Sequence, residues 1–190
     1  MKLYRPLPDV IEYKGRRYRL RLSFDRVLAA LDVLEDDGAP PDVRNEAAVS
    51  LLIKGRKKPD GGALEAIFKM LSGEKTTRSA TKTMDFSQDA AYIYAGFRQA
   101  YGIDLLQERG KLHWMQFSAL LQALPDDTRM MQIVSIRTRP IPKPTKYNAD
   151  ERAALMKAKQ EYALRGSDTA ADCAESAGRL FDALSAIAKR

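Results

Sequence analysis

The chain contains few of the side chains that usually build metal and catalytic sites, since its 190 residues include one histidine, His113, and one cysteine, Cys173. A single cysteine can form neither an internal disulfide nor half of a metal cluster. A long apolar run is missing as well, because the longest uncharged apolar stretch, residues 90–97, is far too short to cross a bilayer. These absences predict a protein without a metal, a cofactor or a membrane segment, located in a reducing cytoplasm.

The only histidine precedes the only tryptophan, Trp114, and the pair is the first candidate for an active site. Imidazole titrates near neutral pH, so an enzyme with one histidine is expected to use it. However, the nearest acids, Asp104 and Glu108, are not at the i±3 or i±4 spacing that would orient the ring on a helix. Neither G-x-S-x-G nor H-E-x-x-H occurs. We therefore interpret His113 as the structural start of a helix and predict that the chain is not an enzyme.

Asp85 and Asp89 form an acidic pair four residues apart, which in principle could hold a cation or serve acid–base chemistry. Both precede an apolar stretch of helical period. Acids in the first turn of a helix complement its dipole and cap its free amides, so the sequence favours this structural role.

The segment VIEYKGRRYRLRLSF, residues 10–24, predicts a small β-hairpin whose two runs are separated by Lys14-Gly15. In the second run arginines alternate with apolar residues, the period of a half-buried strand: Arg17, Arg19 and Arg21 against Tyr18, Leu20 and Leu22. An isolated hairpin is marginal in water, so its Tyr/Leu face needs a cover. We expect that cover to be the helix that begins after Ser23.

The rest of the chain predicts helices, with apolar residues at helical spacing from near positions 24, 41, 60, 85, 112, 128, 149 and 167. Residues 72–83 lack an apolar period and predict a mobile loop, while residues 137–148 predict an extended connection. We expect a mainly α fold with an N-terminal β-hairpin packed on a multi-helix bundle. Residues 1–141 would form this core domain, and residues 142–190 a C-terminal extension whose one or two helices can extend away.

The net charge of +7 is clustered, because residues 1–23 carry seven Lys or Arg against two acids and residues 137–165 carry eight against three. A solvated basic surface is the simpler interpretation. The more specific interpretation is phosphate binding by two groups of side chains: Arg16, Arg17, Arg19 and Arg21 with Arg137, Arg139, Lys143 and Lys146. Phosphate-binding surfaces usually also show aromatics or a recognition helix among the charges, so nucleic acid is the less favoured partner.

A band of aromatic side chains occupies more than one helix face between residues 92 and 121. Such bands usually form a core, but aromatics on two faces leave some for a partner surface. The candidate anchors for a partner are Tyr92, Tyr94, Phe97, Trp114 and Phe117.

Residues 84–141 read MDFSQDAAYIYAGFRQAYGIDLLQERGKLHWMQFSALLQALPDDTRMMQIVSIRTRPI. Six features follow one another in this stretch: an acidic-Phe start, an aromatic helix, Tyr-Gly-Ile-Asp-Leu, Leu-His-Trp, a Phe-x-Ala-Leu-Leu helix and a closing Ile-Arg. This order resembles a bacteriophage tail-region family, the fifteenth gene product of Listeria-type siphophages. The stretch YKGRRYRLRLSFDRVLAAL is similar to the start of phage tail assembly chaperones, in which a short hairpin leads into a Ser-Phe helix. Together these stretches cover most of the chain.

The resemblance implies a non-enzymatic, tail assembly chaperone-like protein of a phage or prophage that acts in the host cytoplasm. Such proteins bind the long, hydrophobic tape measure protein and keep it soluble, help to recruit the tail tube protein, and self-associate. Two alternatives stay open: a basic nucleic-acid-binding phage protein, and a structural component of the tail or virion.

Overall fold

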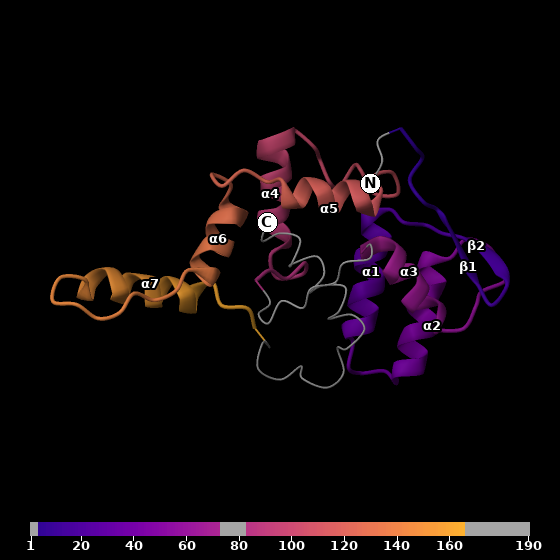
Figure 1. Ribbon diagram of the computed structural model, residues 1–190, viewed down its shortest axis with the longest axis horizontal. Helices are drawn as coiled ribbons and strands as arrows, with labels where there is room; N and C mark the ends of the chain where they lie inside the picture. The colour runs from indigo at the N-terminus through magenta and orange to yellow at the C-terminus, as the bar shows by residue number, and fades with distance from the viewer. Residues whose placement is uncertain (1–3, 73–82, 166–190) are drawn as a thin grey trace.

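The computed structural model describes residues 4–72 and 83–165. Figure 1 shows a hairpin at one end of the molecule, a group of helices in the middle, and a last helix that projects from the other end. The elements are β1 Val10–Tyr13, β2 Arg16–Arg19, α1 Phe24–Glu35, α2 Pro41–Leu52, α3 Ala63–Ser72, α4 Ala90–Tyr101, α5 Trp114–Gln122, α6 Arg129–Thr138 and α7 Ala149–Glu161. The predicted mainly α fold with an N-terminal hairpin is confirmed.

The hairpin is antiparallel, with Ile11 opposite Tyr18. Lys14 and Gly15 form its turn, with φ of 50° and 70°. Positive φ at both central residues is the geometry of a type I′ turn, whose twist matches that of the strands. The Lys-Gly turn predicted from the sequence is therefore confirmed.

The helix that packs on β1 is α3, and not α1 as the sequence had suggested. Asp60, just before α3, joins the two elements because its carboxylate accepts hydrogen bonds from Lys14 Nζ at 2.6 Å and Tyr13 Oη at 2.7 Å. These two donors lower the pKa of Asp60 to about 2. Gly62 is required beside this contact, because a Cβ at that position would lie 2.6 Å from Tyr13 Oη.

α1 packs instead mainly on α2. Only residues 36–40 join these helices, so they lie antiparallel, and they form the most extensive helix–helix contact of the described residues. Arg44 of α2 is 6% exposed and its guanidinium donates to the Leu34 carbonyl of α1 at 3.0 Å. The buried face of α1 follows the predicted helical period: Phe24, Val27, Ala30, Leu31 and Leu34.

Aromatic rings from α1, α4 and α5 meet at Phe117. The Phe117 ring stacks on Phe24 with centroids 5.0 Å apart, and on Phe97 with centroids 5.2 Å apart. Trp114, one helical turn earlier, lies 5.5 Å from Phe117, and Phe86 packs edge-on against Trp114 at 5.8 Å. Phe97 and Trp114 are 0% exposed and Phe117 is 1% exposed. We call these five rings the aromatic cluster.

α5 begins at Trp114, close to the predicted start, and His113 is its N-cap. His113 Nδ1 accepts the Met115 N–H at 3.1 Å, while the Gln116 side-chain oxygen accepts the His113 N–H at 3.2 Å. This reciprocal pair is a capping box in which an imidazole takes the place of the usual hydroxyl. The structural role predicted for His113 is thus confirmed.

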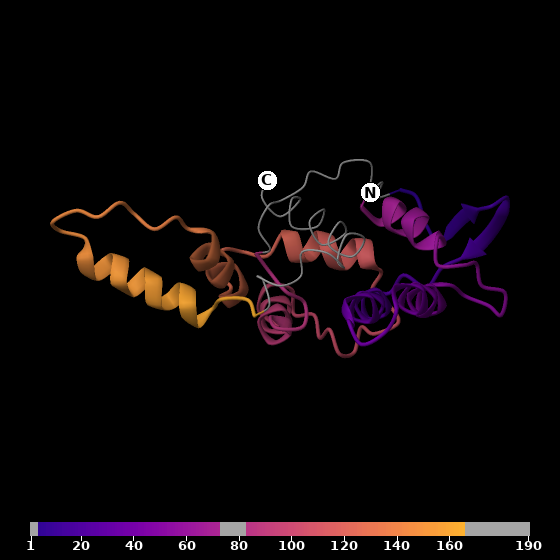
Figure 2. The same ribbon diagram turned by 90° about the horizontal axis from the view of Figure 1, so that it is seen from below.

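The last described helix, α7, projects from the rest of the molecule. α6 packs on α4, and α7 contacts α6. Figures 1 and 2 show α7 beside the extended connection that precedes it, with both projecting from the other helices. We call residues 139–161 the arm, and residues 4–72 with 83–138 the body. Most of the predicted loop at 72–83 and the helix predicted from residue 167 lie outside the described residues, and the domain division at residue 141 stays a prediction.

Truncation of Trp114 should strongly destabilise the body. Trp114→Ala removes a ring that is 0% exposed, and we expect it to lower the free energy of unfolding by about 3–5 kcal/mol. Urea unfolding followed by circular dichroism measures this change. Tyr147→Ala is the control, because Tyr147 is 90% exposed, and should change stability by less than about 0.5 kcal/mol. A Trp114→Ala chain with wild-type stability would contradict this packing.

The His113 cap should make stability depend on pH. Burial lowers the pKa of the imidazole from its usual 6.5, and this effect outweighs the opposing Pro8 carbonyl and Asp9 carboxylate. Only the neutral ring can accept the Met115 N–H through Nδ1. The unfolded chain therefore takes up a proton at higher pH than the folded chain. The contribution is complete above the unfolded pKa and decreases as the pH falls below about 6.5 toward the folded pKa.

His113→Asn is the variant that tests this dependence, because asparagine is a good N-cap and does not titrate. Between about pH 7.5 and about pH 5, the wild-type chain should lose more stability than the variant in parallel thermal melts. Equal losses in the two chains would show that the imidazole is not the titrating group.

Candidate partner-binding surface

The aromatic residues predicted as partner anchors divide into two groups. Phe97, Trp114 and Phe117 belong to the aromatic cluster, and in the folded chain they present almost no surface to a partner. Tyr92 and Tyr94 lie half-buried on α4 and pack against the same core. A role in partner binding for these two tyrosines stays a prediction.

The hairpin arginines lie on the surface. Arg17, Arg19 and Arg21 are exposed, and no ion pair involves them within residues 4–72 and 83–165. The second basic group is less uniform. Lys143 and Lys146 are exposed, whereas the Arg137 side chain is only 11% exposed and pairs with an acid.

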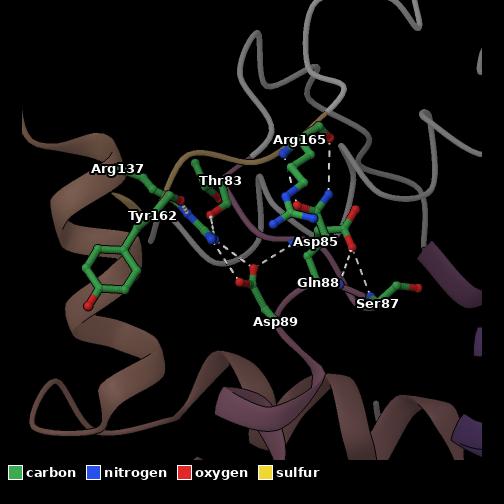
Figure 3. A network of polar contacts seen from close by, with 8 residues as sticks. All are labelled: Thr83, Asp85, Ser87, Gln88, Asp89, Arg137, Tyr162 and Arg165. Carbon is green, nitrogen blue, oxygen red and sulfur yellow. Dashed lines mark hydrogen bonds and ion pairs between the residues drawn. The ribbon is translucent and has the colours of Figure 1, made fainter. Parts of the chain in front are cut away.

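A buried ion pair between Asp89 and Arg137 joins α4 to α6 (Figure 3). The guanidinium binds both carboxylate oxygens, with Nη1 at 2.6 Å from Oδ2 and Nη2 at 2.8 Å from Oδ1. Nη1 also donates to the Thr83 carbonyl at 3.1 Å. The Asp89 side chain is 1% exposed, so this charge is almost fully removed from water. Bidentate charge-assisted bonds are strong and fix the relative orientation of their partners. We call this pair the arginine–aspartate node.

The two acids that were both expected to cap α4 have different roles. The Asp85 carboxylate accepts the N–H groups of Ser87 at 2.9 Å and Gln88 at 2.7 Å, so it caps the turn that precedes α4 and not α4 itself, which begins at Ala90. The Asp89 side chain makes no capping bond to α4. It accepts the Asp85 N–H at 2.9 Å and faces Arg137, because a guanidinium is a stronger partner for a buried carboxylate than the helix amides are.

The node also holds the C-terminal end of the arm. Arg137 Nε donates to the Tyr162 carbonyl at 2.6 Å, and Lys159 Nζ donates to the Arg137 carbonyl at 2.7 Å. Just beyond, the Gln88 amide and the Arg165 backbone exchange hydrogen bonds of 2.9 and 3.1 Å (Figure 3). The end of α7 is therefore fixed to α4 and α6 mainly by polar contacts.

The arm exposes apolar side chains next to lysines. Ile141 is 44% exposed, Tyr147 is 90% exposed and Met156 is 45% exposed. Lys143 and Lys146 lie in the same connection and are also exposed, and the Lys146 ammonium lies 5.9 Å from the centre of the Tyr147 ring. These five residues are the arm surface, the candidate partner-binding surface of the described residues.

The inner side of α7 and the residue after it are formed by Leu155, which is 8% exposed, and by the half-buried Lys159 and Tyr162. The arm surface was missed because two of its apolar residues, Ile141 and Tyr147, lie outside any helix. Helical periodicity does not detect them, although isolated apolar residues in a proline-rich connection were a usable signal.

Neither a metal site nor a membrane-spanning helix occurs among the described residues. No group of three or more His, Cys, Asp or Glu side chains in residues 4–72 and 83–165 is placed to hold a metal ion. Among the helices that the structure describes, none has the length and apolar character needed to span a membrane.

Comparison with known proteins identifies one family. The model of the family described as "Bacteriophage Gp15 protein" matches residues 3–164, which is most of the chain and all of the elements described above. No curated protein and no solved structure matches the chain.

Neutralising Asp89 should destabilise the fold and release the arm. Asp89→Asn leaves the buried Arg137 guanidinium without a counter-charge, and we expect a loss of about 3–5 kcal/mol in the free energy of unfolding. Amide hydrogen exchange in α7 should accelerate at the same time. Glu151→Gln is the matched control, because the Glu151–Arg139 pair is 58% exposed on both sides and is expected to contribute at most about 1 kcal/mol. Equal effects of the two variants would contradict a special role of the node.

Proposed function

Because this chain belongs to the bacteriophage Gp15 family, we propose that it is a tail assembly chaperone-like protein that binds and solubilises the tape measure protein and self-associates during tail morphogenesis. The proposed protein is not an enzyme, acts in the host cytoplasm and helps to recruit the tail tube protein. The observation that carries the proposal is the family match over residues 3–164. The similarity of residues 13–31 to the start of phage tail assembly chaperones supports it.

The arm surface is the part of the molecule that suits an apolar, elongated partner. Its apolar residues are exposed in the single chain, and burial of such side chains against a partner is favourable by roughly 25 cal/mol per Å² of apolar surface. The arm projects from the body, so a partner can reach it without disturbing the aromatic cluster. Exposed apolar residues flanked by charged ones are typical of sites where an amphipathic helix docks.

The second candidate function is nucleic-acid binding, which the exposed hairpin arginines favour. Phosphate contacts release counterions, so this binding should weaken steeply as salt rises. Apolar docking on the arm should change little with salt. Binding of generic DNA with a steep salt dependence by a chain that stays monomeric would favour this second function.

Co-expression with the tape measure protein of the same phage tests the proposal. We expect the wild-type chain to move the tape measure protein into the soluble fraction and to co-elute with it. Tyr147→Glu/Met156→Glu should reduce the soluble, co-eluting fraction at least several-fold, because it places two charges in the apolar contact. Tyr4→Glu/Leu106→Glu is the matched control: these residues are 76% and 59% exposed on the body, and the variant should behave as the wild type.

The two parts of the proposal fail in different ways. A tape measure protein that stays insoluble and forms no complex with the wild-type chain would overturn the chaperone role. A complex that tolerates the arm variant, or that is equally weakened by the body control, would keep the chaperone role and remove the arm surface as its site.

A further inference from the structure

The charges of the α1–α2 pair are separated by sign along its length. At one end, extended segments before α1 and after α2 pair with each other: Lys54 N–H donates to the Arg19 carbonyl at 2.8 Å, and Arg21 N–H donates to the Leu52 carbonyl at 2.7 Å. Leu20 and Ile53 form the bridge between them, and both are buried. The neighbouring side chains of Arg19, Arg21 and Lys54 therefore point to solvent, and all three are exposed.

This end is a concentrated positive surface. Arg26 and Lys58 also belong to it. Burial of the Lys58 ammonium lowers its pKa, and repulsion by Arg21 and Arg26 lowers this pKa further. Lys58 Nζ donates to the carbonyls of Ser50 and Ile53 at the end of α2, both at 2.7 Å, which fixes the ammonium in place. Within the described residues no acid forms an ion pair with this set. The basic base is defined as Arg19, Arg21, Arg26, Lys54 and Lys58.

The opposite end of the pair is acidic. Residues 32–46, which include the connection between α1 and α2, contain six acids and one basic residue, Arg44. Arg44 is 6% exposed, and its Nη1 donates to the Leu34 carbonyl and to Asp37 Oδ1 at 3.3 Å, so it compensates only one of these acids. The acidic tip is defined by the exposed residues Glu35, Asp36, Asp37, Asp42 and Glu46.

The two ends do not neutralise each other within one chain. α1 has 12 residues, which gives a length of about 18 Å. Charges at solvent-exposed sites are screened beyond about 10 Å at 0.1 M salt, so the base and the tip act as independent surfaces. Each surface gathers side chains that carry the same charge, and their mutual repulsion is unfavourable in the isolated chain. Docking of a surface with the opposite charge replaces this repulsion with attraction. A second copy of this chain presents such a surface, because its tip is acidic and its base is basic.

We propose that this protein self-associates head to tail, with the acidic tip of one copy docked on the basic base of the next. The inference rests on the self-association in the proposed function and names its surfaces. A contact between two different surfaces repeats from copy to copy, so the products are rings or open spirals and not a closed two-fold dimer. The arm surface lies outside both docking surfaces and stays available to the tape measure protein.

Charge reversal at each surface, followed by sedimentation velocity, tests the proposal. The tip variant is Asp42→Lys/Glu46→Lys, and the base variant is Arg21→Glu/Lys54→Glu; none of these four side chains makes a hydrogen bond or ion pair within the described residues. Ala154→Glu/Lys157→Glu/Gln160→Glu on the arm is the control, since these exposed residues belong to no proposed surface and the variant changes the net charge as much as the base variant does. Circular dichroism confirms that each variant is folded.

At about 0.1 M salt we expect assemblies of the wild-type chain and of the arm control, and dissociation of both near 1 M salt, where screening acts within about 3 Å. Each reversed variant alone should be monomeric. An equimolar mixture of the two should assemble again, because the tip of the base variant is still acidic and the base of the tip variant is still basic. Restoration by mixing cannot arise from misfolding of either variant.

Four results would overturn the inference. A wild-type chain that is monomeric at low salt would remove it directly. Folded variants that assemble like the wild type, or that fail to assemble when mixed, would show that self-association uses other surfaces. Neither result would bear on binding of the tape measure protein. A base variant that keeps its assemblies but loses binding to a duplex DNA probe would assign the basic base to phosphate.

Discussion

Phe117 is the residue on which the arrangement of the body depends, because its ring stacks on one ring from α1 and one from α4. Stacked aromatic pairs add about 0.5–1.5 kcal/mol each beyond the burial of their area. α1 brings α2 with it through a connection of a few residues, and the backbone pairing after α2 then places the end of the hairpin. α4 brings α6 and the arm through Asp89 and Arg137. The Phe117 ring therefore orients the basic base, the acidic tip and the arm relative to one another.

The sequence predicts the local elements well because their causes are local. Helical period, the His113 cap and the left-handed Gly102 at the end of α4 depend on neighbouring residues, and so does the Lys14-Gly15 turn. What it could not predict is which element packs on which. The hairpin packs on α3 and α1 packs mainly on α2, and nothing within residues 10–24 carries that information. The sequence likewise placed Trp114 in a band of aromatic residues, but did not show that its side chain lies in the core.

The basic residues show the same limit at the level of function. Arg137 was grouped with Arg139 and two lysines because they are close in sequence, yet its side chain is buried on Asp89 and fixes the arm. Conversely, Arg21 and Lys54 are 33 positions apart and share one surface, because a short backbone pairing brings them together. Charge counted along the chain therefore mixes structural and surface residues. Only the tertiary contacts separate the charges that hold the fold from those that a partner can meet.

The burial of the one tryptophan has a practical consequence. Trp114 is 0% exposed inside the aromatic cluster, far along the chain from the arm surface and the acidic tip. Its intrinsic fluorescence therefore reports the state of the body alone, and its emission moves to longer wavelength only when water reaches the indole. A partner that docks on the arm or a copy that docks on the tip leaves that signal unchanged, whereas loss of the fold does not. The chain thus carries its own spectroscopic probe for distinguishing association from unfolding.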